Sequence, residues 1–382
     1  MPASADLMMI QRGARLRRSP FFDATLHAGC WGYTVYNHML LPIGFDDLNE
    51  EYRSLVNYVT VWDVSVERQV EITGPDAFAF TNLLTPRDLT QCKVGQGKYV
   101  VITAEDGGIV NDPVLLRLGE NHFWMAVADS DVLLWAKGVA YGSGMKVEIN
   151  EPDVSPLQIQ GPKSKPLMQR LFGDEVVELQ YYHFVETALD DIPVVVTRTG
   201  WSGEVGFEIY LRDGSRGDEL WQRVMQAGKP YRIAATGPSD IRRIEAGILN
   251  YGIDMTLAHN PFEVGLGWLV QLEQDADFIG KEALRRIKER GVTRKLVGVE
   301  IEGEPLDLNM TRWPVHAGAA RVGEITSAVY SPRLEKNIGY AMVPVEHAEP
   351  GTRLTAAAPV GEVPITVVPK PFVDPKKDLP KS

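Results

Sequence analysis

The sequence predicts an α+β protein with a duplicated core and a small C-terminal β domain. The duplication shows in two stretches, 70–84 and 157–172, each of which combines an alternating strand, a Gly-Pro pair and a helical pattern. The stretch 296–368 is rich in Val, Ile, Thr and Gly and has little helical periodicity. These features favour two related α+β subdomains followed by an all-β module.

In the first subdomain, Gly74-Pro75 separates strand from helix, because proline is pre-set for the first helical turn. Asp129 and Ser130 supply N-cap chemistry for a helix that runs through Val139. Alternation of apolar and polar residues predicts strands at 98–103, 114–118 and 123–128.

Gly161-Pro162 is the matching punctuation in the second subdomain. Helical periodicity predicts helices at 217–227, 238–249 and 280–290, the last ended by Gly291 as a C-cap. Strands are predicted at 193–198, 206–212, 296–301, 321–328 and 338–343.

The domain organisation follows from these elements. Residues 1–295 form one region of two interleaved subdomains, with repeat units near 66–150 and 155–250. A β-barrel is expected at 296–370, and the polar, proline-rich tail 371–382 is expected to be extended or loose.

Composition excludes several classes of protein. The 382 residues are 44% hydrophobic and 24% charged, which is ample for a large core of two or three domains. The 51 acidic against 39 basic residues give a net charge of −12, so no nucleic-acid partner is expected. Cys30 and Cys92 are too few for a disulfide framework or a thiolate zinc site. A cytoplasmic protein in a reducing compartment is expected.

The N-terminal segment carries four arginines, Arg12, Arg15, Arg17 and Arg18, without the apolar stretch of a secretory signal. A basic extension is the favoured interpretation, and a short mitochondrial presequence is the alternative. No apolar run reaches the roughly 18 residues that a membrane span needs, so no membrane partner is expected.

Common catalytic motifs are missing. There is no G-x-G-x-x-G and no G-x-x-x-x-G-K-[ST] phosphate loop, and at 200–204 Glu204 stands where a nucleophile elbow requires glycine. The seven histidines show no metal-ligand spacing, so no metal site is predicted.

Several glycine-bounded segments combine acids with aromatic residues, and in their order the sequence resembles the aminomethyltransferase family, founded on the T-protein of the glycine cleavage system. The segments that carry the resemblance are SPFFD (19–23), GQGKY (95–99), GGIVNDP (107–113), RTGWSGEVGFEIY (198–210), RIEAG (243–247), NPFEVGLGW (260–268), FIGKEAL (278–284) and GEITSAVYSP (323–332). The resemblance implies a three-domain cloverleaf, with two intertwined folate-binding subdomains and a C-terminal β-barrel.

Within that family the sequence is most similar to the tetrahydrofolate-dependent dimethylsulfoniopropionate demethylases. The segments concerned are GYTVYNHMLLP (32–42), VWDVSVERQV (61–70), ADSDVLLWAKG (128–138) and EPDVSPLQIQGP (151–162). A glycine-cleavage T-protein is expected to carry Asp-Asp after the Gly-Gly turn and Gly-Tyr-Thr-Gly later. Here Asn111-Asp112 and the stretch 200–203, Gly-Trp-Ser-Gly, stand in those places.

The resemblance places the pterin ring of tetrahydrofolate, the implied co-substrate, on Glu208. A carboxylate suits a pterin edge because it can accept two adjacent N–H donors. Asp112 is the candidate catalytic residue, to orient the folate nitrogens or accept the N5 proton, and an Asx-turn is its alternative role. Tyr99 is a candidate wall for the folate ring, or else a core tyrosine.

The candidate substrate-binding residues are Tyr36, Trp201 and Tyr210, whose positions resemble those of the demethylases' substrate and folate pocket. A sulfonium donates no hydrogen bond, so aromatic faces must hold it, at about 0.5–2 kcal/mol per cation–π contact. The expected reaction moves a methyl group from dimethylsulfoniopropionate to N5 of tetrahydrofolate, giving 5-methyltetrahydrofolate and 3-(methylthio)propionate.

Two alternatives are kept. One is a related folate-dependent transferase that acts on a betaine, a methylamine, an aryl methyl ether or a glycine-cleavage intermediate. The other is a non-enzymatic folate-binding module, although its expected Lys-Gly-Cys-Tyr motif is absent and Cys92 lies in TQCKV. The expected partners are tetrahydrofolate and a small methyl donor, and the sequence leaves a homodimer open.

Overall fold

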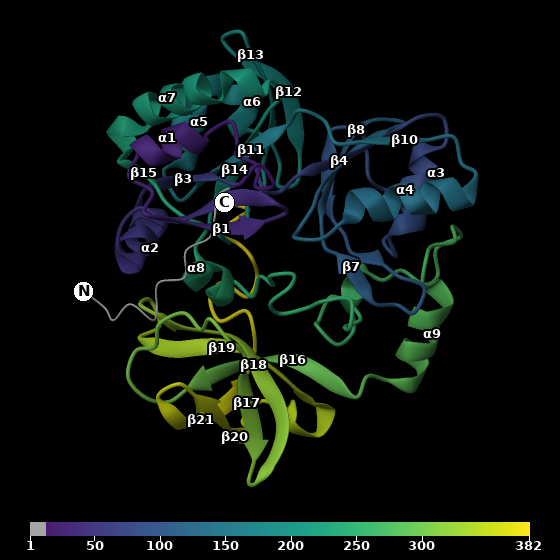
Figure 1. Cartoon of the computed structure of the whole chain (residues 1–382), viewed down its shortest axis with the longest axis vertical. Coiled ribbons are helices and arrows are strands. Elements are labelled where there is room, and N and C mark those ends of the chain that lie inside the picture. Colours follow the sequence, from purple (N-terminus) through teal and green to yellow (C-terminus); the bar gives the residue numbers. More distant parts are fainter. Residues whose placement is uncertain (1–12) are drawn as a thin grey trace.

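The computed structural model describes residues 13–382, which form three lobes around a common centre (Figure 1). Two lobes each contain an antiparallel or mainly antiparallel sheet covered by helices, and the third is a closed β-barrel. Arg12 and the rest of the first twelve residues lie outside the described part. No helix in residues 13–382 is long and apolar enough to cross a membrane.

The first lobe is a five-stranded antiparallel sheet in the order β10-β4-β9-β8-β5. Its helices α3 (Ala77–Leu84) and α4 (Val132–Ser143) cover one face, where Phe80 and Ala136 pack in one core with Ile72 and Phe123. The strands are β4 (Gln69–Thr73), β5 (Gln96–Tyr99), β8 (Val114–Gly119), β9 (His122–Ala126) and β10 (Glu148–Asn150).

The second lobe is a six-stranded sheet in the order β12-β13-β14-β11-β3-β15. Here β3 pairs antiparallel with β11 and parallel with β15, so the whole first lobe is inserted between two neighbouring strands of the second. The strands are β3 (Val59–Asp63), β11 (Ser155–Gln160), β12 (Phe184–Leu189), β13 (Ile192–Thr197), β14 (Gly206–Leu211) and β15 (Ile233–Ala235).

Four helices cover one face of this second sheet. Alternate strand residues such as Ile159 and Phe207 point into an apolar core shared with Leu220. The opposite face packs toward the first lobe, where Trp124 and Tyr210 lie in one cluster. The covering helices are α1 (Phe22–His27), α5 (Ser164–Phe172), α6 (Asp174–Val177) and α7 (Gly217–Gly228).

A hairpin and a helix complete the N-terminal part. The turn residues Asn37 and His38 both have positive φ, 49° and 61°, which suits a tight hairpin turn. Asn37 is buried, and its side-chain amide donates to the carbonyls of Val66, Val127 and Ala128, so it fastens the hairpin to the first lobe. The elements are β1 (Gly32–Tyr36), β2 (Met39–Gly44) and α2 (Leu48–Asn57).

The third lobe is a closed barrel of six strands, which confirms both the predicted all-β module and the α+β fold class. The helix α8 (Asp240–Glu245) lies between the barrel and the second lobe, and Ile241 and Ile244 pack with the barrel residue Tyr340 (Figure 1). The helix α9 (Lys281–Arg290) leads into the barrel. The barrel strands are β16 (Arg294–Ile301), β17 (Trp313–Ala317), β18 (Ala320–Ser331), β19 (Lys336–Pro344), β20 (Arg353–Ala358) and β21 (Gly361–Val368).

Three predicted elements differ from the structure. The strand predicted at 98–103 is divided between β5 and β6 (Ile102–Thr103), because β6 leaves the sheet to pair with β7 (Ile109–Asn111). The helix predicted at 238–249 ends at Glu245, since Gly247 has a φ of +71°. The N-cap position of α4 is Asp131, whose side chain makes no capping hydrogen bond, and Asp129 instead accepts a hydrogen bond from the Asn37 backbone amide.

The C-terminal tail is packed and not loose as predicted. The backbone amides of Phe372 and Val373 both donate to the Glu245 carbonyl, at 2.9 Å each. The Phe372 ring stacks on Tyr340 with 6.2 Å between ring centroids, and Arg198 donates to the Ser382 carbonyl at 2.6 Å. Apolar contact and capping of α8 therefore hold a segment whose composition suggested disorder.

The two repeats share a strained glycine. Gly74 and Gly161 have φ values of +116° and +117°, and a Cβ atom at Gly161 would lie 2.5 Å from the Leu55 carbonyl oxygen. We predict that Gly161→Ala lowers the free energy of unfolding by about 2 kcal/mol or more, because both strain and overlap oppose the side chain. Urea unfolding of both proteins measures this difference in the free energy of unfolding.

The matched control is Gly138→Ala, at a helical position with open space around it. This change should raise the free energy of unfolding by about 0.5–1 kcal/mol. Equal stability of the two variants would contradict the strain at Gly161.

Candidate active site

A row of polar and aromatic side chains crosses the face of the second sheet that lies opposite α1, α5, α6 and α7. Thr197 pairs with Glu208, Glu208 with Gln158, and Gln158 with Trp62, on the neighbouring strands β13, β14, β11 and β3. Directly opposed residues of antiparallel strands point to the same face. All four are at most 3% exposed, so the row is a buried polar surface toward the molecular centre.

Glu208 lies in this row as a buried carboxylate held by neutral donors. It accepts hydrogen bonds from Gln158 at 2.8 Å, Thr199 at 2.6 Å, Tyr210 at 2.8 Å and Thr197 at 3.2 Å. Burial raises the pKa of Glu208, and these hydrogen bonds oppose the rise. Glu208 is 3% exposed, so it is not a solvent-facing residue of the strand.

Gln158 connects Glu208 to the loop of Trp201. Its side-chain nitrogen donates to Glu208, and its oxygen accepts from the Trp201 backbone amide at 3.3 Å. The Trp201 ring is partly buried against Leu55, Trp62 and Val64. The predicted pterin and substrate residues are therefore linked by one side chain.

Asp112 and Tyr99 meet at the edge of the first lobe. The Tyr99 hydroxyl donates to the Asp112 carboxylate at 2.9 Å. Burial raises the pKa of Asp112 to about 7, although the Tyr99 hydrogen bond opposes the rise. Its neighbour Asn111 is buried and bonds the Ala128 backbone and Ser130, so it has a structural role.

Glu67 is a third acid at this centre, and the sequence analysis did not single it out. Burial, and then the charges of Glu208 and Asp112, raise the pKa of Glu67 well above its usual range. Its carboxylate accepts no hydrogen bond from residues 13–382 and forms no ion pair with them. Only its place in the VWDVSVERQV segment signalled it.

Tyrosines surround the three acids. Burial, followed by the charges of Glu67 and Asp112, raises the pKa of Tyr36, which ends strand β1 beside the anchored turn. Tyr210 is fully buried, with its ring 6.4 Å from that of Trp124. Tyr182, also missed, has a pKa raised by burial and by the charges of Tyr181 and Glu208. The charges of Glu208 and Asp112 act on Glu67, and the charge of Glu67 acts on Tyr36 and Tyr210. Tyr99 is connected to this group through its hydrogen bond to Asp112, and Trp201 through Gln158.

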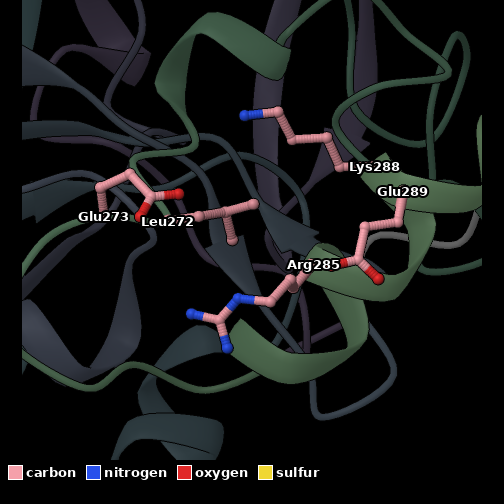
Figure 2. A pocket seen from close by; sticks show the side chains of 5 residues that line it. All are labelled: Leu272, Glu273, Arg285, Lys288 and Glu289. Carbon is pink, nitrogen blue, oxygen red and sulfur yellow. The ribbon is translucent and has the colours of Figure 1, made fainter.

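A surface pocket on α9 is lined by other residues than this cluster. The pocket, of about 290 Å³, is lined by α9 residues and the preceding loop, namely Leu272, Glu273, Arg285, Lys288 and Glu289 (Figure 2). None of the predicted site residues lines it. Within residues 13–382, no group of three or more His, Cys, Asp or Glu side chains is arranged to hold a metal ion.

Two family models match the chain. The GCVT N-terminal domain matches residues 21–274, and the glycine cleavage T-protein C-terminal barrel domain matches residues 294–374. The chain belongs to the glycine cleavage T-protein family. It is a transferase of this family, and the cluster described above lies within its N-terminal domain.

Individual relatives narrow the comparison. The chain is 41% identical to the dimethylsulfoniopropionate demethylase of Ruegeria pomeroyi, over 92% of this chain and 96% of that protein. It is 32% identical to an aminomethyltransferase of Bacillus cytotoxicus, over 94% and 98%. The crystal structure of the glycine cleavage aminomethyltransferase of Bartonella henselae superposes with a TM-score of 0.84 at 23% identity, over 94% of this chain and 98% of that one, which shows the shared fold.

The raised pKa of Asp112 makes a prediction about stability. An unfolded Asp has a pKa near 3.9, so folding opposes its ionisation increasingly between about pH 4 and pH 7. Asp112→Asn should therefore unfold at a higher temperature than the wild type at pH 8, and by a smaller margin at pH 4. Thermal unfolding at both pH values measures this.

The control is Asp275→Asn at an exposed loop position. Its difference from the wild type should stay the same at both pH values. A margin for Asp112→Asn that does not grow with pH would show that the carboxylate is not disfavoured by its surroundings.

Proposed function

We propose that this protein is a tetrahydrofolate-dependent demethylase that transfers a methyl group from dimethylsulfoniopropionate to N5 of tetrahydrofolate. The carrying observation is a pair of acids that act on each other: Glu208, which accepts hydrogen bonds from four neutral donors, and Glu67, which accepts none from residues 13–382. Glu208 suits the pterin, which has N–H donors, and Glu67 suits the sulfonium, a cation without N–H donors. The 41% identity to the Ruegeria pomeroyi demethylase supports the same reaction.

Glu208 binds the pterin in this proposal. Three hydroxyl donors hold Oε2, whereas Oε1 accepts only from Gln158, so Oε1 has room for a pterin N–H group. A second pterin N–H group would replace one of the hydroxyl donors on Oε2. Tyr99 lies against the folate ring, and its hydroxyl keeps Asp112 directed at the folate nitrogens.

The methyl donor occupies the aromatic side of the cluster. Tyr36, Trp201 and Tyr210 supply aromatic surface for the sulfonium. Glu67 is disfavoured as a carboxylate in the free site, and the bound cation favours its ionised form, which then supplies the opposite charge. Tyr210 also acts through its hydroxyl, which holds Glu208. Burial strengthens this attraction because there is little water to screen it.

The reaction needs alignment more than acid catalysis. The N5 lone pair forms the new N–C bond while the S–C electron pair returns to sulfur, which leaves as a neutral thioether. N5 then carries an extra proton, and Asp112 is suited to accept it because its pKa is about 7. Holding both reactants in line can contribute about 7–11 kcal/mol in favourable cases.

The second candidate is transfer from another donor by the same folate chemistry. Identities of 32% and 33% to Bacillus aminomethyltransferases support it. A betaine, a methylamine, an aryl methyl ether or a glycine-cleavage intermediate would replace the sulfonium.

The deciding experiment incubates the protein anaerobically with tetrahydrofolate and each donor in turn, and identifies the folate product by mass spectrometry. We expect 5-methyltetrahydrofolate with dimethylsulfoniopropionate. Product only with another donor would favour the second candidate, and folate binding without product would favour a non-enzymatic role.

We predict that Glu208→Ala weakens tetrahydrofolate binding by about 1–3 kcal/mol or more, because the pterin loses a charged acceptor. Isothermal titration calorimetry measures the dissociation constant. Glu186→Ala, at an exposed position of the same sheet, should bind like the wild type. Unchanged affinity in Glu208→Ala would remove Glu208 from the folate site.

We predict that Glu67→Gln raises the KM for dimethylsulfoniopropionate at least about tenfold, or ~1.4 kcal/mol, because the sulfonium loses its counter-charge. The control ligand is 4-methylpentanoate, which has the shape of the donor without its positive charge. Its inhibition constant should be the same for both proteins. A parallel loss for both ligands would indicate a role in shape and not in charge.

A further inference from the structure

Gln158 has an unusual position among the buried side chains of the site. It is 1% exposed and lies mid-strand in β11, with Glu208 on one neighbouring strand and Trp62 on the other. Its amide nitrogen donates to Glu208 and its amide oxygen accepts from the Trp201 backbone. The Gln158 amide is thus hydrogen-bonded at both its nitrogen and its oxygen, to the proposed folate side of the site and to the proposed donor side.

The two hydrogen bonds depend on each other. If the amide turned over, its oxygen would face the Glu208 carboxylate and its nitrogen would face the Trp201 N–H, so both contacts would become repulsive. The amide therefore has one satisfactory orientation. A shift of the Trp201 loop moves the same group that holds Glu208.

We propose that Gln158 is a positioning residue that couples methyl-donor binding to folate binding. This rests on the proposed function, in which Glu208 contacts the folate and Trp201 the donor. A ligand on either side fixes the amide, so the second ligand meets a site that is already ordered. We expect each ligand to tighten the other about five- to tenfold, within the usual range of coupling between sites.

Gln160 is the matched control on the same strand. It is also fully buried and lies two residues away on the same face. Its amide nitrogen donates to the carbonyls of Thr199 and Phe207, and its oxygen accepts from Ser202. It thus supports the same loop without contacting Glu208 or the Trp201 amide, so Gln160→Met reports the general cost of losing a buried amide.

The experiment measures tetrahydrofolate affinity by anaerobic calorimetry, with and without saturating 4-methylpentanoate. The methyl groups of this probe are bonded to carbon and cannot be transferred, so only binding is observed. We expect the wild type and Gln160→Met to show the coupling, and Gln158→Met to bind folate with less than a twofold effect of the probe. Thermal unfolding of both variants compares their stability.

Full coupling in Gln158→Met, or no coupling in the wild type, would overturn the proposal. Loss of coupling in both variants would also overturn it, because the effect would then belong to the loop as a whole. A wild type that couples the ligands but transfers no methyl group would reject the proposed function and leave the coupling intact.

Discussion

Burial of the Glu208 carboxylate is the constraint on which the rest of the site depends. A carboxylate removed from water is costly unless hydrogen bonds replace those it loses. Here the donors come from β11, β13, β14 and the loop after β13, as Gln158, Thr197, Tyr210 and Thr199. A slip of one residue in β14 would turn Glu208 into the apolar helix side of the sheet. The register of the sheet and the site are therefore specified together.

The buried arginines nearby are paired with other acids, so they do not neutralise the three acids of the candidate site. Arg242 pairs with Glu204 at 2.7 Å, and Arg243 with Asp254 at 2.7 Å, so these buried arginines are already engaged. Glu67, Asp112 and Glu208 form no ion pair within residues 13–382. The net charge of −12 is compatible with a cationic ligand. The stronger argument for such a ligand is that these three acids have no positively charged partner within residues 13–382.

Much of the fold was predictable from local pattern. The Gly-Pro pairs, the alternating strands and the β-rich end predicted the repeated strand–helix units and the barrel, because those signals lie within a few residues of one another. The place of β3 between β11 and β15 was not predictable, since its partners are about a hundred or more residues away. The packed tail was missed because a few contacts, such as Phe372 on Tyr340, outweigh a polar composition.

For the site, motifs located Glu208, Asp112 and Tyr99, whereas Glu67 and Gln158 needed the tertiary arrangement. Gln158 lies in an alternating strand whose polar residues face inward, and alternation alone does not tell which side is inside. The pKa of Glu67 is raised first by burial and then by the charges of Glu208 and Asp112, and no local pattern encodes this environment.

The insertion of the first lobe into the second also divides the site mechanically. Asp112 and Tyr99 belong to the inserted lobe, and Glu208 and Gln158 to the host sheet. Two backbone connections join these lobes around the insertion, and Arg68 on one is bonded to Glu151 on the other. The lobes are also joined through backbone hydrogen bonds, from the Gly97 amide to Tyr182 at 2.7 Å and from the Phe184 amide to Gly95 at 3.1 Å. The spacing between the two halves of the candidate site therefore depends on contacts between the lobes that lie outside the site itself.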